Sequence, residues 1–171
     1  ALAPVIVGGG QERGLRAGTE NVSLAAGFAE SFARIALERE REARRLAPLR
    51  EALLKALTAG IPSLCVNGEA KRMQPHLLNV SIPNIQSEYV TLSLDARGIS
   101  ISTKSACREG ENRRSHVVAM LAAAAREAER GESADWRAEN TLRFSLGRET
   151  SMRDIETAAA ELVRIITERK T

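Results

Sequence analysis

Cys107 is the residue of this sequence best suited to nucleophilic chemistry. It stands in a Lys-Ser-Ala-Cys-Arg loop that follows a short strand pattern and precedes a helical one. Thiolate is the reactive form of cysteine, and the nearby cations Lys104 and Arg108 favour it by lowering the thiol pKa. The local sequence leaves two interpretations open, a reactive thiol or an ordinary surface cysteine. The second cysteine, Cys65, lies between apolar neighbours in a strand pattern and is expected to be buried and structural.

Two arginine-bearing segments have the residue types of an anion site. The first is glycine-rich, runs from Gly8 to Thr19 and precedes a helical pattern, so its backbone N–H groups and the positive helix end favour a phosphate or carboxylate. It is not a P-loop, since no Gly-Lys-Ser/Thr follows, and a structural hinge explains it equally well. The second is a strand-like run around Arg143. A guanidinium can grip a carboxylate with two hydrogen bonds, although the pattern alone favours a solvent-facing arginine.

The apolar spacing predicts one long helix followed by short alternating elements. Apolar residues at steps of three and four predict a helix over 22–59, with a charged middle, a kink or restart at Pro48 and a stop at Gly60. Thr150 or Ser151 is expected to cap the last helix, with Asp154 forming a capping box. The other predicted elements are strands at 1–7 (buried), 63–67, 77–82, 99–102 and 141–146, helices at 88–97 and 114–130, and loops at 103–112 and 131–140. Strands interleaved with helices predict an α/β or α+β sandwich with helices on a small sheet.

The composition excludes several classes of protein. The chain has 171 residues, 43% hydrophobic, 27% charged and 3% aromatic, which suits one globular domain, with or without an appendage. No apolar run approaches the roughly 20 residues of a membrane span, and no stretch of the sequence has the pattern of a signal peptide. Two cysteines and two histidines argue against a disulfide framework and a metal site, and favour a reducing, cytoplasmic location. The net charge is only +3, and most arginines alternate with glutamates. A nucleic-acid-binding surface would instead show a patch of positive charge alone.

Four motifs together resemble the cysteine desulfurases that feed iron–sulfur cluster assembly. The glycine-rich segment ending at Thr19 is followed by Ser-Ala-Cys at Cys107, Ser-His-Val-Val-Ala-Met from Ser115, and Arg-Phe-Ser-Leu-Gly-Arg from Arg143. The resemblance extends over 7–169. It implies the C-terminal part of a homodimer of aminotransferase class V, with fold type I and pyridoxal 5′-phosphate (PLP) as cofactor. Residues 1–21 are then a remnant of the large PLP-binding domain, 22–59 a long connecting helix, and 60–171 the α+β small domain with the cysteine loop.

The resemblance also implies roles for individual residues. The enzymes of this family remove sulfur from L-cysteine as a protein-bound persulfide and release L-alanine. Cys107 corresponds to the cysteine that takes the sulfur, Arg143 to the arginine that holds the substrate carboxylate, and Thr19 to a threonine that reaches the PLP phosphate across the dimer. A sulfur-acceptor protein, such as an iron–sulfur scaffold or a thiolation protein, is the expected partner. No nucleic acid and no membrane is expected to bind.

Two departures from the family pattern change these expectations. The lysine that binds PLP covalently follows a Ser-x-His stretch in the family, and none of the four lysines here lies in such a context (Lys55, Lys71, Lys104 and Lys170). The chain, which begins on a strand pattern without methionine, is therefore expected to be part of an enzyme and inactive by itself. Lys104 also replaces a loop glycine, and is expected either to lower the Cys107 pKa or to alter the choice of acceptor. The alternative function is a noncatalytic module that dimerises or carries sulfur on Cys107.

Overall fold

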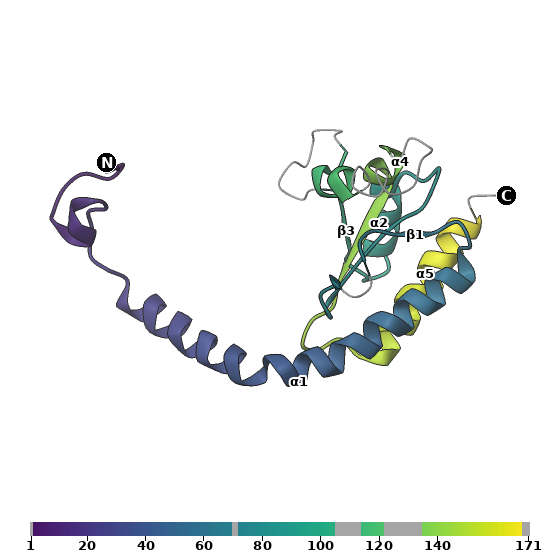
Figure 1. Cartoon of the computed structure of the whole chain (residues 1–171), viewed down its shortest axis with the longest axis horizontal. Helices are drawn as coiled ribbons and strands as arrows, with labels where there is room; N and C mark the ends of the chain where they lie inside the picture. The colour runs from purple at the N-terminus through teal and green to yellow at the C-terminus, as the bar shows by residue number, and fades with distance from the viewer. Residues whose placement is uncertain (1, 70–71, 105–113, 122–134, 169–171) are drawn as a thin grey trace. The chain divides into compact units, whose positions relative to one another are not determined.

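The computed structural model describes residues 2–69, 72–104, 114–121 and 135–168 of the chain. It divides into two compact units, Ala1–Glu40 and Arg41–Thr171. The longest element, helix α1 (Val22–Gly60), begins in the first unit and ends in the second. Figure 1 follows the elements along the chain. This confirms the predicted long helix to within one residue, and Pro48 lies inside it without dividing it into two elements.

The first unit consists of a short 3-10 helix, η1 (Gln11–Gly14), and the beginning of α1. Asn21 caps α1, since its side-chain oxygen accepts a hydrogen bond from the Leu24 N–H at 3.0 Å. The predicted buried strand before Gly8 is wrong for this chain. Only one bridge forms there, between Ile6 and Arg16, and the neighbouring Val5 is 95% exposed. A strand needs a partner along its length, and no other described segment pairs with this one.

An apolar stripe follows the first part of α1. Its members recur at steps of three and four, so they share one face of the helix. All of them are 59–73% exposed, and the two phenylalanine rings lie 6.4 Å apart. The members of this apolar stripe are Leu24, Phe28, Phe32 and Ile35. Exposed apolar surface of this periodicity is typical of a helix face that packs against another body.

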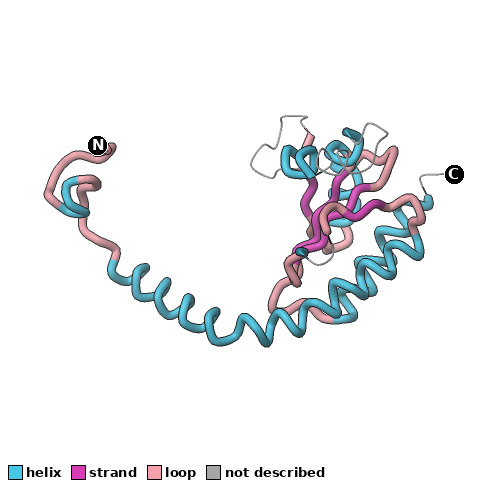
Figure 2. Tube along the Cα trace, in the orientation of Figure 1, coloured by secondary structure: helices cyan, strands magenta, loops and turns pink. Residues whose placement is uncertain are grey.

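The second unit is built on a four-stranded antiparallel sheet with the order β1-β2-β4-β3. Its strands are β1 (Cys65–Val66), β2 (Leu77–Ser81), β3 (Ser102–Thr103) and β4 (Thr141–Ser145). The central strands, β2 and β4, pair along their whole length. Figure 2 draws the strands in magenta. The antiparallel sheet confirms the expected α+β small domain. The predicted strand at 99–102 is wrong in position, because only Ser102 and Thr103 pair with β4.

One apolar core lies against one face of this sheet. Alternate strand residues point to the same face, and those of β2 and β4 on this face are fully or almost fully buried. They pack with the second part of α1 and with helices α2 (Ser87–Asp95) and α5 (Met152–Glu168). Residues of this core include Leu53, Leu57, Leu78, Val80, Val90, Leu94, Leu142, Phe144, Leu162 and Ile166. Packing of the core holds the strands in place, and it thereby positions the side chains on the opposite face of the sheet.

Gly60 lets α1 approach α5 closely. A Cβ added at Gly60 would overlap the side chain of Val163, whereas a Cβ at Gly27, also in α1, would meet nothing within 4 Å. We therefore expect Gly60→Ala to lower the free energy of unfolding by about 1–3 kcal/mol through overpacking. Gly27→Ala is the matched control, and it should raise helix stability by up to about 1 kcal/mol. Urea denaturation measures both changes, and Val163→Ala should restore the Gly60→Ala variant. An unchanged free energy of unfolding in Gly60→Ala would contradict the close packing of α1 against α5 at Gly60.

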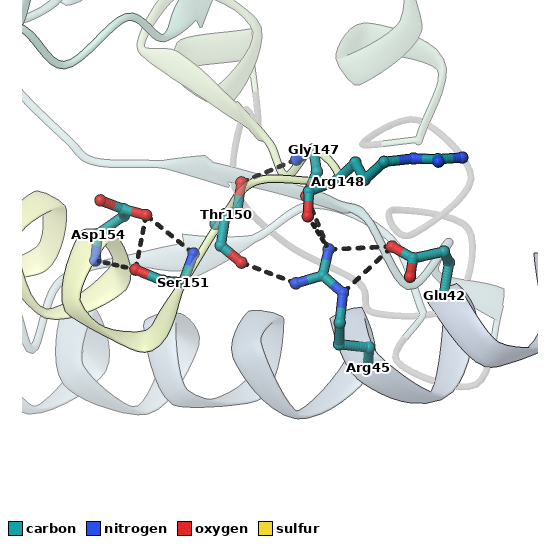
Figure 3. A network of polar contacts seen from close by, with 7 residues as sticks. All are labelled: Glu42, Arg45, Gly147, Arg148, Thr150, Ser151 and Asp154. Carbon is teal, nitrogen blue, oxygen red and sulfur yellow. Dashed lines mark hydrogen bonds and ion pairs between the residues drawn. The ribbon is translucent and has the colours of Figure 1, made fainter.

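The N-terminus of α5 carries the predicted capping box. Ser151 Oγ accepts a hydrogen bond from the Asp154 N–H at 3.4 Å, and Asp154 Oδ2 accepts one from the Ser151 N–H at 2.8 Å (Figure 3). Ser151 is thus the cap, as expected, while Thr150 accepts a hydrogen bond from the Gly147 N–H. The hydrogen bonds from the backbone and side chain of Ser151 hold the pKa of Asp154 below its ordinary value.

This lowered pKa predicts a pH-dependent contribution to stability. The ionised Asp154 carboxylate stabilises the folded chain fully above the pKa that the group has when unfolded, and the contribution is lost as the pH falls through the lower folded-state pKa. Asp154→Asn should therefore lower the urea midpoint at pH 7, and the difference from the wild type should shrink toward pH 3. Thr157→Asn is the matched control on the same helix. A constant difference across the pH range would contradict the capping role.

Candidate functional site

Arg143 lies in the middle of β4, on the face of the sheet opposite the apolar core. Its neighbours Leu142 and Phe144 are buried in the core, and the alternation of side chains turns Arg143 the other way. It stands opposite Asn79 of β2 on one side and Ser102 of β3 on the other. The pattern-based expectation of a solvent-facing arginine is only half right, since Arg143 is half-buried. Its Nε is buried without a hydrogen-bond partner among the described residues.

A polar network occupies the same face beside Arg143. Its members are Asn67, Asn79, Ser81 and Thr141. The Asn67 amide donates to Asn79 Oδ1 and to Ser81 Oγ, both at 2.7 Å, and the Thr141 hydroxyl donates to Asn79 Oδ1 at 2.8 Å. Asn79 Oδ1 therefore already accepts two hydrogen bonds. The network satisfies its own buried polar groups, and the Nε of Arg143 remains a donor without an acceptor.

A short helix, α4 (Asp135–Glu139), is fastened to this face of the sheet. Ser81 Oγ donates to the Arg137 carbonyl at 2.8 Å, and Ser87 Oγ donates to the Glu139 carbonyl at 3.0 Å. The polar sequence predicts a loop over 131–140, and this prediction is wrong for the described residues, since Asp135–Glu139 form a helix. Helix α4 is held by hydrogen bonds from distant segments, and its own five residues carry no apolar periodicity that would reveal it.

The turn that follows β4 is bound to α1 by one arginine. Arg45 donates to the carbonyl oxygens of Gly147 at 3.0 Å, Arg148 at 2.8 Å and Thr150 at 2.8 Å (Figure 3). Glu42, one turn earlier on α1, accepts two hydrogen bonds from the same guanidinium, which holds the pKa of Glu42 below its ordinary value. The strand that carries Arg143 is therefore anchored at its C-terminal end to the long helix.

Lys104 ends the described segment that leads toward Cys107. Its backbone is in the left-handed region, with φ of 48°, which glycine adopts more readily than other residues. Its side chain is 14% exposed, and its ammonium pairs with Glu88 Oε1 at 2.5 Å. Burial is the largest single influence on the pKa of Glu88 and would raise it, but the hydrogen bond and charge of Lys104 together with hydrogen bonds from the Glu88 backbone and Ser87 hold the pKa below its ordinary value.

The three residues singled out by the sequence analysis are placed unequally by the structure. Arg143 is in the second unit, and Thr19 is exposed in the first, between η1 and α1. Cys107 lies outside the described residues, so the structure does not test its role. Cys65, expected to be buried, is only half-buried on the edge strand β1. No three His, Cys, Asp or Glu side chains of the described segments gather as a metal site. Within those segments, no helix is long and apolar enough to cross a membrane.

Two described residues, one in each unit, have side chains suited to the anionic groups of a PLP enzyme and its substrate, whereas no described lysine suits covalent attachment of PLP. The unpartnered Nε of Arg143 suits a carboxylate, and the exposed hydroxyl of Thr19 is able to bind a phosphate oxygen. Neither described lysine suits covalent attachment of the cofactor, because Lys55 is exposed on α1 and Lys104 is paired with Glu88. A buried lysine without an anionic partner is what such an attachment requires.

Comparisons with known proteins show the family to which the chain belongs. The model of the family aminotransferase class-V matches residues 7–157. A cysteine desulfurase of Bradyrhizobium diazoefficiens is 33% identical over 165 residues, covering 96% of this chain and 39% of that protein. A cysteine desulfurase of a Frankia species is 38% identical over 170 residues, covering 96% of this chain and 37% of that protein. The chain thus spans about two fifths of the length of these relatives.

Solved structures give the same picture of the fold. A NifS-like protein from Rickettsia africae superposes with a TM-score of 0.76 at 27% identity, covering 96% of this chain and 40% of that one. A second NifS-like protein gives a TM-score of 0.75 at 26% identity. Matches of this extent in sequence and in structure show that the chain belongs to the aminotransferase class-V family, with cysteine desulfurases among its relatives.

Proposed function

We propose that this chain is the C-terminal part of a cysteine desulfurase, and that it supplies the substrate-carboxylate site and the sulfur-accepting cysteine of that enzyme. The observation that carries the proposal is the half-buried Arg143, whose Nε has no partner among the described residues. Burying a donor without an acceptor costs free energy in the absence of ligand. A carboxylate bound there would remove that cost, which is a good reason to hold an arginine in this position.

The proposed roles follow from the chemistry of each side chain. Arg143 holds the carboxylate of L-cysteine and thereby fixes the orientation of the substrate. Thr19 binds the phosphate of PLP. When bound, PLP supplies the electron sink that loosens the C–S bond of the substrate. The Cys107 thiolate attacks the substrate sulfur. An S–S bond forms while the C–S bond breaks, its electron pair stays on carbon, and a proton added there gives L-alanine.

The apolar stripe of α1 supports the proposal that further polypeptide completes the enzyme. Its four side chains are exposed in the described structure, and each large apolar residue left in water costs about 1.5–3 kcal/mol relative to burial. The proposed occupant is the part of the enzyme that carries the PLP-binding lysine. The whole enzyme is then a homodimer that passes its persulfide to an acceptor protein such as an iron–sulfur scaffold.

The test compares the chain by itself with the chain joined to the N-terminal part of the Frankia relative. The chain alone should release no sulfide from L-cysteine in the presence of PLP and should show no absorbance band of lysine-bound PLP. The joined protein should show both. Turnover by the chain alone would contradict the partial-enzyme proposal, and a folded, PLP-binding joined protein without sulfide release would contradict the desulfurase proposal.

The competing function, a sulfur carrier without chemistry of its own, rests on Cys107 alone. Incubating the chain with a separate working desulfurase and L-cysteine, followed by mass spectrometry, tests it. A persulfide adduct on Cys107 would support the carrier function. No adduct, or equal labelling of the half-buried Cys65, would rule it out.

A further inference from the structure

The ion pair between Lys104 and Glu88 occurs where the chain leaves the sheet toward Cys107. Lys104 directly follows β3, an edge strand that pairs with β4 at Ser102 and Thr103. With φ of 48°, the backbone at Lys104 turns in the left-handed region. A lysine adopts this conformation less readily than a glycine, so another interaction must hold it there.

Glu88 is a fixed partner for this lysine. It lies in the first turn of α2, where the positive end of the helix favours an acidic residue. The preceding Ser87 is 1% exposed, and its hydroxyl donates to the Glu139 carbonyl of α4 at 3.0 Å. The start of α2 is therefore tied to α4, and the Glu88 carboxylate meets the Lys104 ammonium, whose side chain is 14% exposed.

Hydrogen bonds also hold the chain at Ser115, which follows Cys107 in the sequence. Ser115 is 4% exposed, and its N–H donates to the Ala138 carbonyl of α4 at 2.8 Å. Its hydroxyl accepts a hydrogen bond from the Val118 N–H at 3.3 Å, as a cap of the helical stretch 116–121. The described residues before and after the cysteine segment are thus both fastened, directly or through α2, to the same short helix.

We propose that Lys104 is a positioning residue, which directs the start of the Cys107 segment through its ion pair with Glu88 and does not supply positive charge to the thiol. The proposal rests on the proposed role of Cys107. The charge of Lys104 is matched by a carboxylate in contact with it, so the pair presents little net charge to its surroundings. A glycine in place of Lys104 would adopt the left-handed backbone without strain, but it would remove the ion pair with Glu88 of α2.

The experiment uses the 171-residue chain with Cys65→Ala, which leaves Cys107 as its one thiol. Three variants are made in this background: Lys104→Gly, Glu88→Gln and the two combined. Amide hydrogen exchange at Ser102–Lys104 reports the loss of the ion pair, and the pH dependence of iodoacetamide alkylation reports the pKa of Cys107. Glu69→Gln is the matched control, since it breaks an exposed pair with Arg72 and removes the same charge. Circular dichroism verifies that each variant is folded.

A positioning role predicts exchange about tenfold faster at these amides in each single variant, and no further increase in the double variant. The alkylation midpoint of the double variant should stay within about 0.2 pH units of the parent, because the net charge is unchanged. Unchanged exchange would overturn the proposal, and so would a raised midpoint in the double variant, since it would show that the lysine charge acts on the thiol. Neither readout needs PLP or turnover, so failure here is distinct from failure of the desulfurase proposal.

Discussion

Replacing Cys107 with alanine in the joined, PLP-binding enzyme is expected to abolish sulfide release from L-cysteine. Without the thiolate, the substrate sulfur has no nucleophile to receive it, and loss of a nucleophile typically costs a factor of about 10³ or more in turnover. L-alanine should disappear together with sulfide, because one C–S bond is broken for each persulfide formed. Steady-state assays of both products measure the effect.

Cys65→Ala is the matched control for this prediction. Cys65 is half-buried on the edge strand β1, and among the described residues its thiol makes a long contact with the Ser63 carbonyl at 4.0 Å. The control should keep the wild-type rate and the wild-type persulfide on Cys107. Sulfide release that survives Cys107→Ala, or a persulfide that forms on Cys65, would overturn the assignment of the nucleophile.

Replacing Arg143 with alanine is expected to lower kcat/KM for L-cysteine by about 10²-fold. This is the factor expected from about 3 kcal/mol of lost charge-assisted hydrogen bonding to a carboxylate. Arg143→Lys should recover only part of the loss, because an ammonium keeps the charge and lacks the planar fork. Cysteamine, which has the thiol and the amine of cysteine without its carboxylate, is the decisive second substrate.

The wild type should prefer L-cysteine to cysteamine, and Arg143→Ala should remove that preference while leaving cysteamine turnover unchanged. Arg72→Ala, which removes an exposed arginine far along the chain, should leave both rates unchanged. The free energy of unfolding should not fall in Arg143→Ala, since the buried Nε has no partner among the described residues. An equal loss for both substrates would show that Arg143 does not recognise a carboxylate.

The long elements of this fold could be predicted from the sequence because each carries its own periodic pattern. Helix α1 and strands β2 and β4 lie within a few residues of their predicted bounds, and helix α5 begins after Ser151, which caps it as its spacing with Asp154 indicates. Helix α4 could not be predicted in this way. Its conformation depends on hydrogen bonds from Ser81 and Ser87, which are distant in sequence. The position of β3 likewise depends on its pairing with β4.

The position of Arg143 on a strand was predictable from the sequence, and its surroundings were less so. The strand pattern places Arg143 opposite the core, but its half-burial results from neighbouring elements that no local pattern reveals. The glycine-rich segment is equally typical of an anion-binding site and of a structural hinge. The role of the exposed Thr19 as a phosphate ligand stays a prediction. The ion pair of Lys104 with Glu88 joins residues sixteen positions apart, so no local sequence pattern predicts it.

The contacts of Arg45 have a consequence for how the sequence of this region can drift. Its guanidinium bonds to three main-chain carbonyls of the turn after β4, so it does not discriminate among the side chains at Gly147 and Arg148. Mutations at those two positions that preserve the backbone path leave the attachment intact. A change of Arg45 to lysine would break it, since one ammonium cannot reach all three oxygens with the geometry of a planar fork. Substitutions in the turn are therefore tolerated only while the codon for Arg45, about a hundred positions earlier in the gene, stays unchanged in meaning.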